Sequence, residues 1–196
     1  MMSGKKKREI RFRYDSEANG YDELYSDEQR TKYELALRRI AISREDRILD
    51  CGCGTGIFLE KVAGNVQSAV GVDLSPKMLH RAQLRLGRLS NVDLVCADFD
   101  FLPFSGGTFA YVFMFTVLLA PAYWGGTIRE SLRVLRTHGT VTLSVPKRET
   151  SSEKLLRKLR KSRLEPRELI DGQTTVDYLV IFSSSSHCMI RSHCIK

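Results

Sequence analysis

A short apolar segment runs directly into a glycine-rich turn near residue 50. Residues 47–59 read RILDCGCGTGIFL, in which Asp50 precedes glycines at positions 52, 54 and 56. Glycine suits positions where φ is positive or where the backbone must approach a ligand closely, because a Cβ would block both. A dinucleotide-binding turn with the spacing G-x-G-x-x-G would require glycine at position 57, where this chain has Ile57. The pattern therefore predicts a strand, a turn and a helix that bind a ligand other than NAD or FAD.

Two further apolar runs end in carboxylates. Residues 68–73 read SAVGVD and residues 91–98 read NVDLVCAD, so that the runs end at Asp73 and Asp98. Ligands on open α/β sheets bind at the carboxyl ends of the strands, where we expect these acids to lie. A carboxylate at the tip of the second strand is able to accept hydrogen bonds from both hydroxyls of a ribose.

These motifs together resemble those of the class I S-adenosylmethionine (SAM) methyltransferases, over roughly residues 10–147. The resemblance implies SAM as the cofactor and a single Rossmann-like domain. It also implies that Asp50 pairs with the methionine ammonium of SAM, that Asp73 holds the ribose hydroxyls, and that Asp98 accepts from the adenine amino group. The cofactor-binding residues implied in this way are Asp50, Gly52, Gly54, Gly56, Asp73, Leu74, Met78, Asp98, Phe99 and Phe115.

Apolar periodicity predicts alternating strands and helices. The predicted strands are 47–51, 68–73, 91–96, 109–119 and 140–145, and the predicted helices are 27–42, 56–64, 75–87, 126–136 and 153–163. This alternation favours an α/β fold with a mostly parallel sheet of six or seven strands flanked by helices, because parallel strands need crossovers. Residues 175–182 predict a further strand, which the family would pair with a last strand near residues 187–195.

The predicted organisation has three parts. Residues 1–13 are expected to form a flexible basic arm, residues 14–182 the methyltransferase domain, and residues 183–196 a final edge strand or a disordered tail.

Aromatic residues near the predicted ligand edge are candidates for contact with the methyl acceptor. Residues 12–25 read FRYDSEANGYDELY and resemble the N-terminal lid of small class I methyltransferases, which makes Tyr14 and Tyr21 candidate catalytic residues. Tyr123, beyond the fourth predicted strand, is the third candidate. Ordinary packing of helices on the sheet would explain the same residues, and the acceptor atom stays open.

Five scattered cysteines do not predict a disulfide framework, which favours a cytoplasmic protein. No apolar run approaches the roughly 20 residues of a membrane span, so no membrane association is expected. The tail contains two His-Cys pairs, at 187–188 and 193–194, but their spacing matches no familiar zinc site and no metal is expected.

The net charge of +8 is concentrated in two segments. Residues 1–13 carry six Lys or Arg and one acid, and residues 147–167 carry nine Lys or Arg and three acids. Since attraction to a polyanion is long-ranged and independent of sequence, RNA is an expected partner; two solvated basic surfaces explain the charge equally well. The overall prediction is a SAM-dependent methyltransferase acting on RNA or on a small molecule. The alternatives are a non-catalytic module that binds SAM or RNA, and a subunit that needs a small activator partner.

Overall fold

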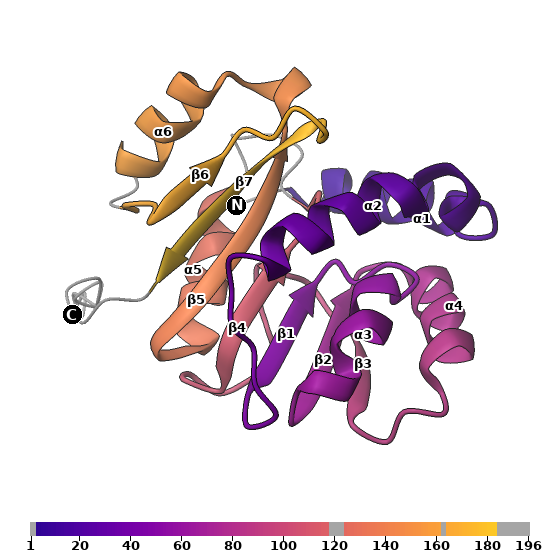
Figure 1. Cartoon of the computed structure of the whole chain (residues 1–196). Helices are drawn as coiled ribbons and strands as arrows, with labels where there is room; N and C mark the ends of the chain where they lie inside the picture. The colour runs from indigo at the N-terminus through magenta and orange to yellow at the C-terminus, as the bar shows by residue number, and fades with distance from the viewer. Residues whose placement is uncertain (1–2, 118–123, 162–163, 184–196) are drawn as a thin grey trace, which may run out of the picture.

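A seven-stranded sheet forms the centre of the computed structural model, which describes residues 3–117, 124–161 and 164–183 (Figure 1). The strands are β1 (Arg47–Cys51), β2 (Ser68–Asp73), β3 (Val92–Cys96), β4 (Phe109–Met114), β5 (Leu135–Pro146), β6 (Glu168–Ile170) and β7 (Asp177–Ser183). Their order across the sheet is β3-β2-β1-β4-β5-β7-β6. Strands β1 to β5 run parallel, whereas β7 is antiparallel to both of its neighbours. The predicted mostly parallel sheet of six or seven strands is thus confirmed.

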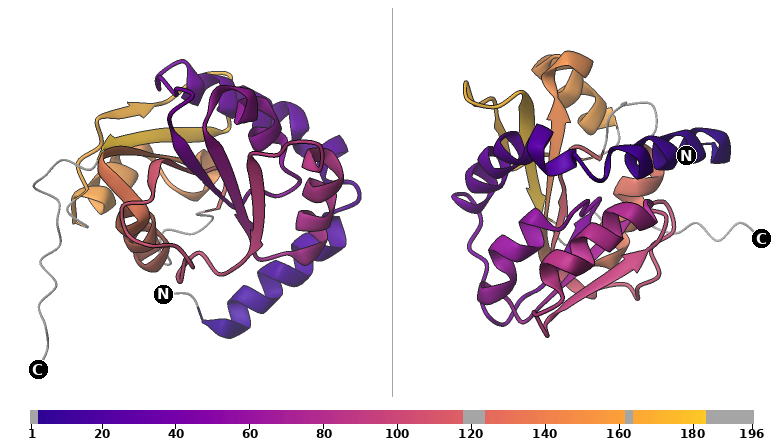
Figure 2. Two further views of the ribbon diagram at one scale, coloured as in Figure 1. Left: turned by 90° about the horizontal axis from the view of Figure 1, so that it is seen from below. Right: turned by 90° about the vertical axis from the view of Figure 1, so that its right-hand side faces the viewer.

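Helices cover both faces of this sheet (Figure 2). They are α1 (Gly4–Glu17), α2 (Tyr21–Leu37), α3 (Ile57–Val62), α4 (Pro76–Leu86), α5 (Trp124–Val134) and α6 (Ser152–Lys161), with short 3₁₀ turns η1 (Ala63–Asn65) and η3 (Lys147–Glu149). One hydrophobic cluster joins α2, α3 and α4 to the sheet through Tyr33, Phe58 and Ala82. The other joins α5 and α6 through Ile128 and Leu155.

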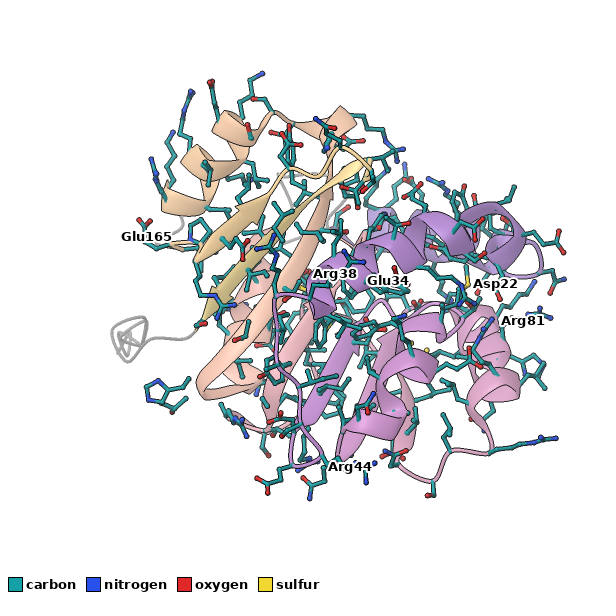
Figure 3. The ribbon with its side chains drawn as sticks, viewed as in Figure 1. Asp22, Glu34, Arg38, Arg44, Arg81 and Glu165 are labelled. Carbon is teal, nitrogen blue, oxygen red and sulfur yellow. The ribbon has the colours of Figure 1, made fainter. Side chains whose placement is uncertain are left out.

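Helices α1 and α2 lie across the edge of the sheet at which the parallel strands end (Figure 1). Ion pairs fix α2 to the helices beneath it. Glu34 lies 3.4 Å from Lys61 of α3, and Asp22 pairs with Arg85 of α4. Figure 3 labels both acids on this helix. The connection matters because the polar side chains that α2 contributes near the strand ends are then held in place.

Strands β1 and β2 begin and end where the sequence predicts, because their continuous apolar runs are buried on both faces of a parallel sheet. The fourth strand is shorter than predicted, since β4 ends at Met114 and Thr116 adopts a positive φ of 58°. The fifth strand is longer than predicted and starts at Leu135, within the predicted helix 126–136. Its early part is irregular, with a shift of register against β4 and a φ of 60° at His138.

Two expectations about the ends of the domain need correction. The flexible arm over residues 1–13 is wrong for residues 4–13, which belong to α1; Ser3 caps this helix by accepting from Lys6 N, and Lys7 is fixed by ion pairs. The partner of β7 in the hairpin is β6, a strand of three residues that the sequence did not predict. The predicted last strand at 187–195, like residues 184–196 as a whole, lies outside the described residues.

Candidate functional site

A pocket opens at the carboxyl-terminal edge of the sheet. Its volume is about 570 Å³ when the space open to solvent is included. The residues predicted for the cofactor that line this pocket are Gly52, Gly54, Asp73, Leu74, Met78, Phe99 and Phe115. The other three predicted residues, Asp50, Gly56 and Asp98, are not part of its wall.

The glycine turn brings bare backbone to the pocket. Gly52, Gly54 and Gly56 all have positive φ values, of 79°, 53° and 83°. Gly52 N donates to Val72 O at 2.7 Å, which ties the turn to β2. A Cβ at Gly52 would overlap Cγ2 of Val117, so a side chain there would fill the space beside the turn. The turn is therefore a cradle that only glycine leaves open.

Asp73 holds this turn and still has hydrogen-bonding capacity towards the pocket. Its Oδ2 accepts from Gly54 N at 3.0 Å, and its Oδ1 accepts from Ser75 N at 2.8 Å. Burial raises the pKa of Asp73 to about 6, while the backbone donors at Ser75 and Gly54 oppose the rise. The carboxylate is therefore mainly ionised at neutral pH, and each oxygen keeps a lone pair for a ligand hydroxyl.

Asp50 is a buried carboxyl near the end of β1, directly before the glycine turn. It is 2% exposed, and among the described residues no group donates a hydrogen bond to it. Burial, and secondarily the charge of Asp73, raises the pKa of Asp50 to about 8. A cationic ligand group nearby would favour the ionised form. A buried acid before the turn, a carboxylate able to accept hydrogen bonds from a diol, and a glycine turn fit SAM, which carries an ammonium and a ribose.

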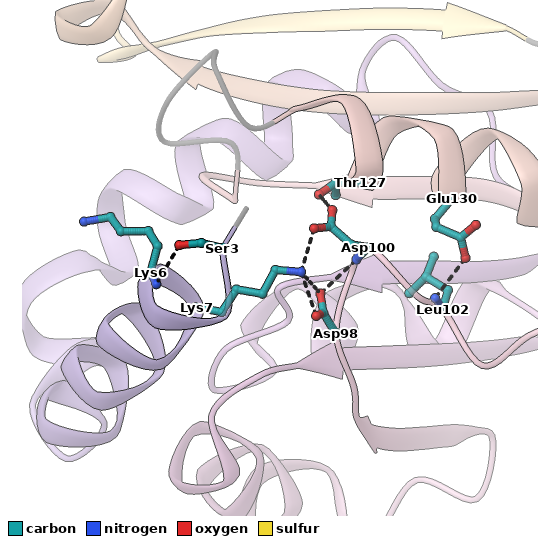
Figure 4. Close-up of polar contacts among 8 residues, drawn as sticks. All are labelled: Ser3, Lys6, Lys7, Asp98, Asp100, Leu102, Thr127 and Glu130. Atoms are coloured by element: carbon teal, nitrogen blue, oxygen red, sulfur yellow. Dashed lines mark hydrogen bonds and ion pairs between the residues drawn. The ribbon is translucent and has the colours of Figure 1, made fainter. Parts of the chain in front are cut away.

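Asp98 forms an ion pair with Lys7, a contact that the sequence did not predict. Lys7 of α1 donates to both oxygens of Asp98, at 2.8 and 2.7 Å, and to Oδ2 of Asp100 at 2.6 Å (Figure 4). Asp100 is itself held by Thr127, whose hydroxyl donates to Oδ1 at 2.9 Å. A lysine from the first helix thus joins the end of β3 to the start of α5.

Two of the three candidate catalytic tyrosines line the pocket, and the third lies outside the described residues. Tyr14 and Tyr21 contribute to the wall, with ring centroids 6.2 Å apart. Burial raises the pKa of both phenols above the usual value. Each therefore stays protonated at neutral pH, so its hydroxyl is able to donate a hydrogen bond. Tyr123 belongs to residues 118–123, which the structure does not describe.

Five further residues complete the wall: Ile10, Arg11, Ser75, Thr116 and Val117. Thr116 follows Phe115 near the carboxyl end of the fourth predicted strand, where ligands on such sheets bind. Ser75 also had a sequence signal, because it precedes Pro76; it caps α4 by accepting from Met78 N at 3.1 Å. Its hydroxyl also donates to Asp15 of α1 at 2.6 Å, which closes this side of the pocket. Contacts between segments so far apart in the chain leave no local pattern.

Metal ligation has no support in the part of the chain that the structure describes. There, no three His, Cys, Asp or Glu side chains are grouped as a metal ion requires. The His-Cys pairs at 187–188 and 193–194 lie outside the described residues. Burial raises the pKa of the Cys51 and Cys53 thiols, so small size explains these cysteines better than reactivity.

Comparison with known proteins supports a SAM-binding role for the pocket. A family model described as a methyltransferase domain matches residues 48–139. The malonyl-acyl-carrier-protein O-methyltransferase of Legionella pneumophila is 36% identical over 109 residues, which cover 55% of this chain and 38% of that protein. Residues 48–139 are a methyltransferase domain of the kind found in SAM-dependent methyltransferases. SAM is the cofactor of this family.

Solved structures share the fold of this methyltransferase domain. A protein of Methanococcus maripaludis, assigned as a SAM-dependent methyltransferase, has a TM-score of 0.73 at 17% identity, covering 90% of this chain and 95% of that one. A chain in the Haloferax volcanii complex between the Trm112 methyltransferase activator and a protein assigned as a methyltransferase has a TM-score of 0.72 at 18% identity, covering 88% and 97%. The methyltransferase chain spans about half the length, or less, of the curated relatives it matches first. Along residues 3–117, 124–161 and 164–183, no helix is both long and apolar enough to cross a membrane.

Proposed function

We propose that the chain transfers a methyl group from SAM to an RNA or small-molecule acceptor. The observation that carries the proposal is the buried carboxyl of Asp50, which lacks a partner among the described residues, close to a pocket lined by the glycine turn and Asp73. Bound SAM supplies an activated methyl group on its sulfonium; the protein has to orient it and exclude water.

In this proposal Asp73 accepts hydrogen bonds from the ribose, and Asp50 offers its charge to the ammonium of the amino-acid end. Leu74, Met78 and Phe99 give the apolar wall against which the adenine packs. Tyr14 and Tyr21, protonated at neutral pH, donate hydrogen bonds that orient the acceptor. They do not remove its proton, since burial raises the pKa of both phenols.

The proposal that RNA is the acceptor or a partner rests on the cations of α6 more than on those of α1. Several cations of α1 are already paired, among them Lys7 with Asp98, Arg11 with Asp15 and Arg13 with Glu17. By contrast, α6 exposes four cations that form no ion pair with any described residue: Lys154, Arg157, Arg160 and Lys161. A cluster of free cations on one helix suits a phosphate backbone. A small molecule is the other candidate acceptor.

A small activator subunit is a further proposal, based on the similarity in fold to the chain from the Trm112 complex. Without such a partner the domain would bind SAM and turn over slowly or not at all. A cytoplasmic location stays a prediction, based on the scattered cysteines.

The direct test supplies methyl-labelled SAM to the purified protein with separate pools of RNA, protein and small metabolites. We expect label in one pool, and loss of that label in Asp73→Ala. Removal of this carboxylate should weaken SAM binding by about 1–3 kcal/mol. Unchanged SAM affinity in Asp73→Ala would contradict the assignment of the pocket. SAM binding without labelling of any pool would favour the non-catalytic module or the missing activator, and co-expression with a candidate activator separates those two.

A further inference from the structure

A buried ion pair lies against the pocket wall on the β4 side. Lys32 of α2 is fully buried, and its Nζ lies 2.9 Å from Oδ2 of Asp177, which is 1% exposed. The same ammonium lies 2.6 Å from Glu28 and donates to Oγ1 of Thr116 at 2.9 Å. Removing two charges from water costs several kcal/mol per ion, so a pair of this kind is weak evidence for stability. Its position next to the pocket offers a better reason for its presence.

The residue that this pair holds has an unusual backbone. Thr116 lines the pocket with a φ of 58°, which is rare for a β-branched residue. Such a conformation costs about 1–3 kcal/mol and persists only when the surroundings determine it. Here several hydrogen bonds fix the backbone and the side chain of Thr116. Thr116 N donates to Ser144 Oγ at 2.8 Å. Its Oγ1 accepts from Lys32 and, at 3.4 Å, from Gln29, and the hydroxyl donates to Asp177 Oδ2 at 3.4 Å.

Gln29 adds an unsatisfied polar atom at the same place. Its Oε1 is buried and accepts no hydrogen bond from the described residues, although the residue is 4% exposed. Its side chain also interacts with Tyr21, another residue of the wall. A buried acceptor without a donor is costly, and a ligand group that donates would satisfy it.

The order of the strands gives this cluster its place along the pocket. Phe99 follows β3 and Leu74 follows β2, whereas Thr116 follows β4, on the far side of β1. If Asp73 holds the ribose, with adenine against Phe99 and Leu74, the opposite end of SAM extends towards Thr116. That end is an amino acid, which carries an ammonium and a carboxylate and needs polar partners.

We propose that Gln29 and Lys32 are positioning residues that hold Thr116 against the amino-acid end of SAM. The inference rests on the proposed function and adds the residues that recognise one part of the cofactor. It predicts a difference between two ligands. The affinity for S-adenosylhomocysteine should depend on these residues, whereas the affinity for 5′-methylthioadenosine, which lacks the amino-acid end, should not.

The test measures both ligands by calorimetry on the full chain with two matched variants. Thr116→Ala and Thr116→Ser both remove the methyl group at the same strained position, and only the serine keeps the hydroxyl. We expect Thr116→Ala, which removes the oxygen through which Lys32, Gln29 and Asp177 hold the turn after β4, to weaken the binding of S-adenosylhomocysteine about tenfold. Its affinity for 5′-methylthioadenosine should change less than about twofold, and Thr116→Ser should resemble the wild type.

A second variant tests the ion pair without leaving a lone buried charge. Lys32→Met combined with Asp177→Asn removes both charges and should give the same loss, selective for S-adenosylhomocysteine. An equal loss of both ligands, an equal loss in Thr116→Ser, or no loss in Thr116→Ala would overturn the inference while leaving the proposed function in place. A wild-type protein that binds neither ligand would instead overturn the proposed function.

Discussion

The Nζ atom of Lys7 lies 2.8 and 2.7 Å from the two carboxylate oxygens of Asp98, a residue 91 positions away along the chain. No residue of α1 is fully buried, although Tyr14 is partly buried beside Tyr21. The pocket wall formed by Ile10, Arg11 and Tyr14 therefore depends largely on polar contacts at Lys7 and Asp15.

Lys7→Met should release α1 from the edge of the sheet. The variant removes charge-assisted hydrogen bonds to both Asp98 and Asp100, so local opening of the helix becomes more favourable. Amide hydrogen exchange over residues 4–17 should accelerate about tenfold or more, with α4 unchanged. Lys6→Met is the matched control, because the one ion pair of Lys6 with a described residue is to Glu9 of the same helix. Equal exchange in the two variants would show that Lys7 does not fasten α1.

Stability should fall as the pH rises through the range in which the buried acids ionise. Burial raises the pKa of Asp73 to about 6 and that of Asp50 to about 8, both from 3.8. The folded chain therefore holds these protons more tightly than the unfolded chain. Their contribution to stability is complete below about pH 4 and is lost as the pH passes 6 and then 8.

Urea unfolding at several pH values between 5.5 and 9 measures this effect. In Asp50→Asn the decline between about pH 6.5 and 8 should disappear, because the carboxyl that ionises there is gone; above about pH 8 the buried thiols of Cys51 and Cys53 add a decline of their own. Asp93→Asn, at an exposed position of β3, should leave the wild-type profile unchanged. If Asp50→Asn kept the same decline, another group would be responsible.

Gly71→Ala should destabilise the fold without touching the pocket. A Cβ at this position of β2 would lie 2.6 Å from Leu59 Cδ1 and 2.8 Å from Cys53 Sγ, inside the packed core. Overpacking of this kind costs about 1–3 kcal/mol, to be measured by denaturant unfolding. Gly64→Ala, where nothing lies within 4 Å of the added Cβ, should change the stability little. Equal stabilities would mean that α3 moves aside at no cost.

The RNA proposal predicts a strong dependence on the cations of α6. Changing Lys154, Arg157, Arg160 and Lys161 together to Gln should weaken RNA binding and reduce its log–log salt slope by about 3. The control changes an equal number of exposed cations elsewhere, namely Arg44, Arg47, Lys77 and Arg88. RNA affinity that falls equally in both variants would point to net charge rather than to this helix. No RNA binding by the wild type would favour a small-molecule acceptor.

Local sequence patterns predicted what depends on local physics. The bounds of β1 and β2 and the positive φ values of the glycine turn follow from continuous apolar runs and from the lack of a Cβ. The same patterns brought Asp73, Met78 and Phe99 to one pocket wall, because parallel strands end at one edge.

Features that depend on distant partners were missed. Residues 4–13 are mostly polar, with Ile10 and Phe12 as the apolar side chains, so their composition resembles a solvated arm. The helix that they form is held by ion pairs of Lys7 with Asp98 and Asp100. Strand β6 has only three residues, which is too short for an alternating pattern. Thr116 takes its conformation from Lys32 and Ser144, each at least 28 positions away.

Lys32 and Asp177 both lie outside residues 48–139, the segment by which the family is recognised. Two proteins could therefore share every residue of that segment and still hold the turn after β4 in different ways. In such proteins, substitutions that change ligand preference would then lie in the helix before the first strand and in the last strand of the chain that the structure describes. A search for variants with altered preference should begin at those two elements rather than at the glycine motif.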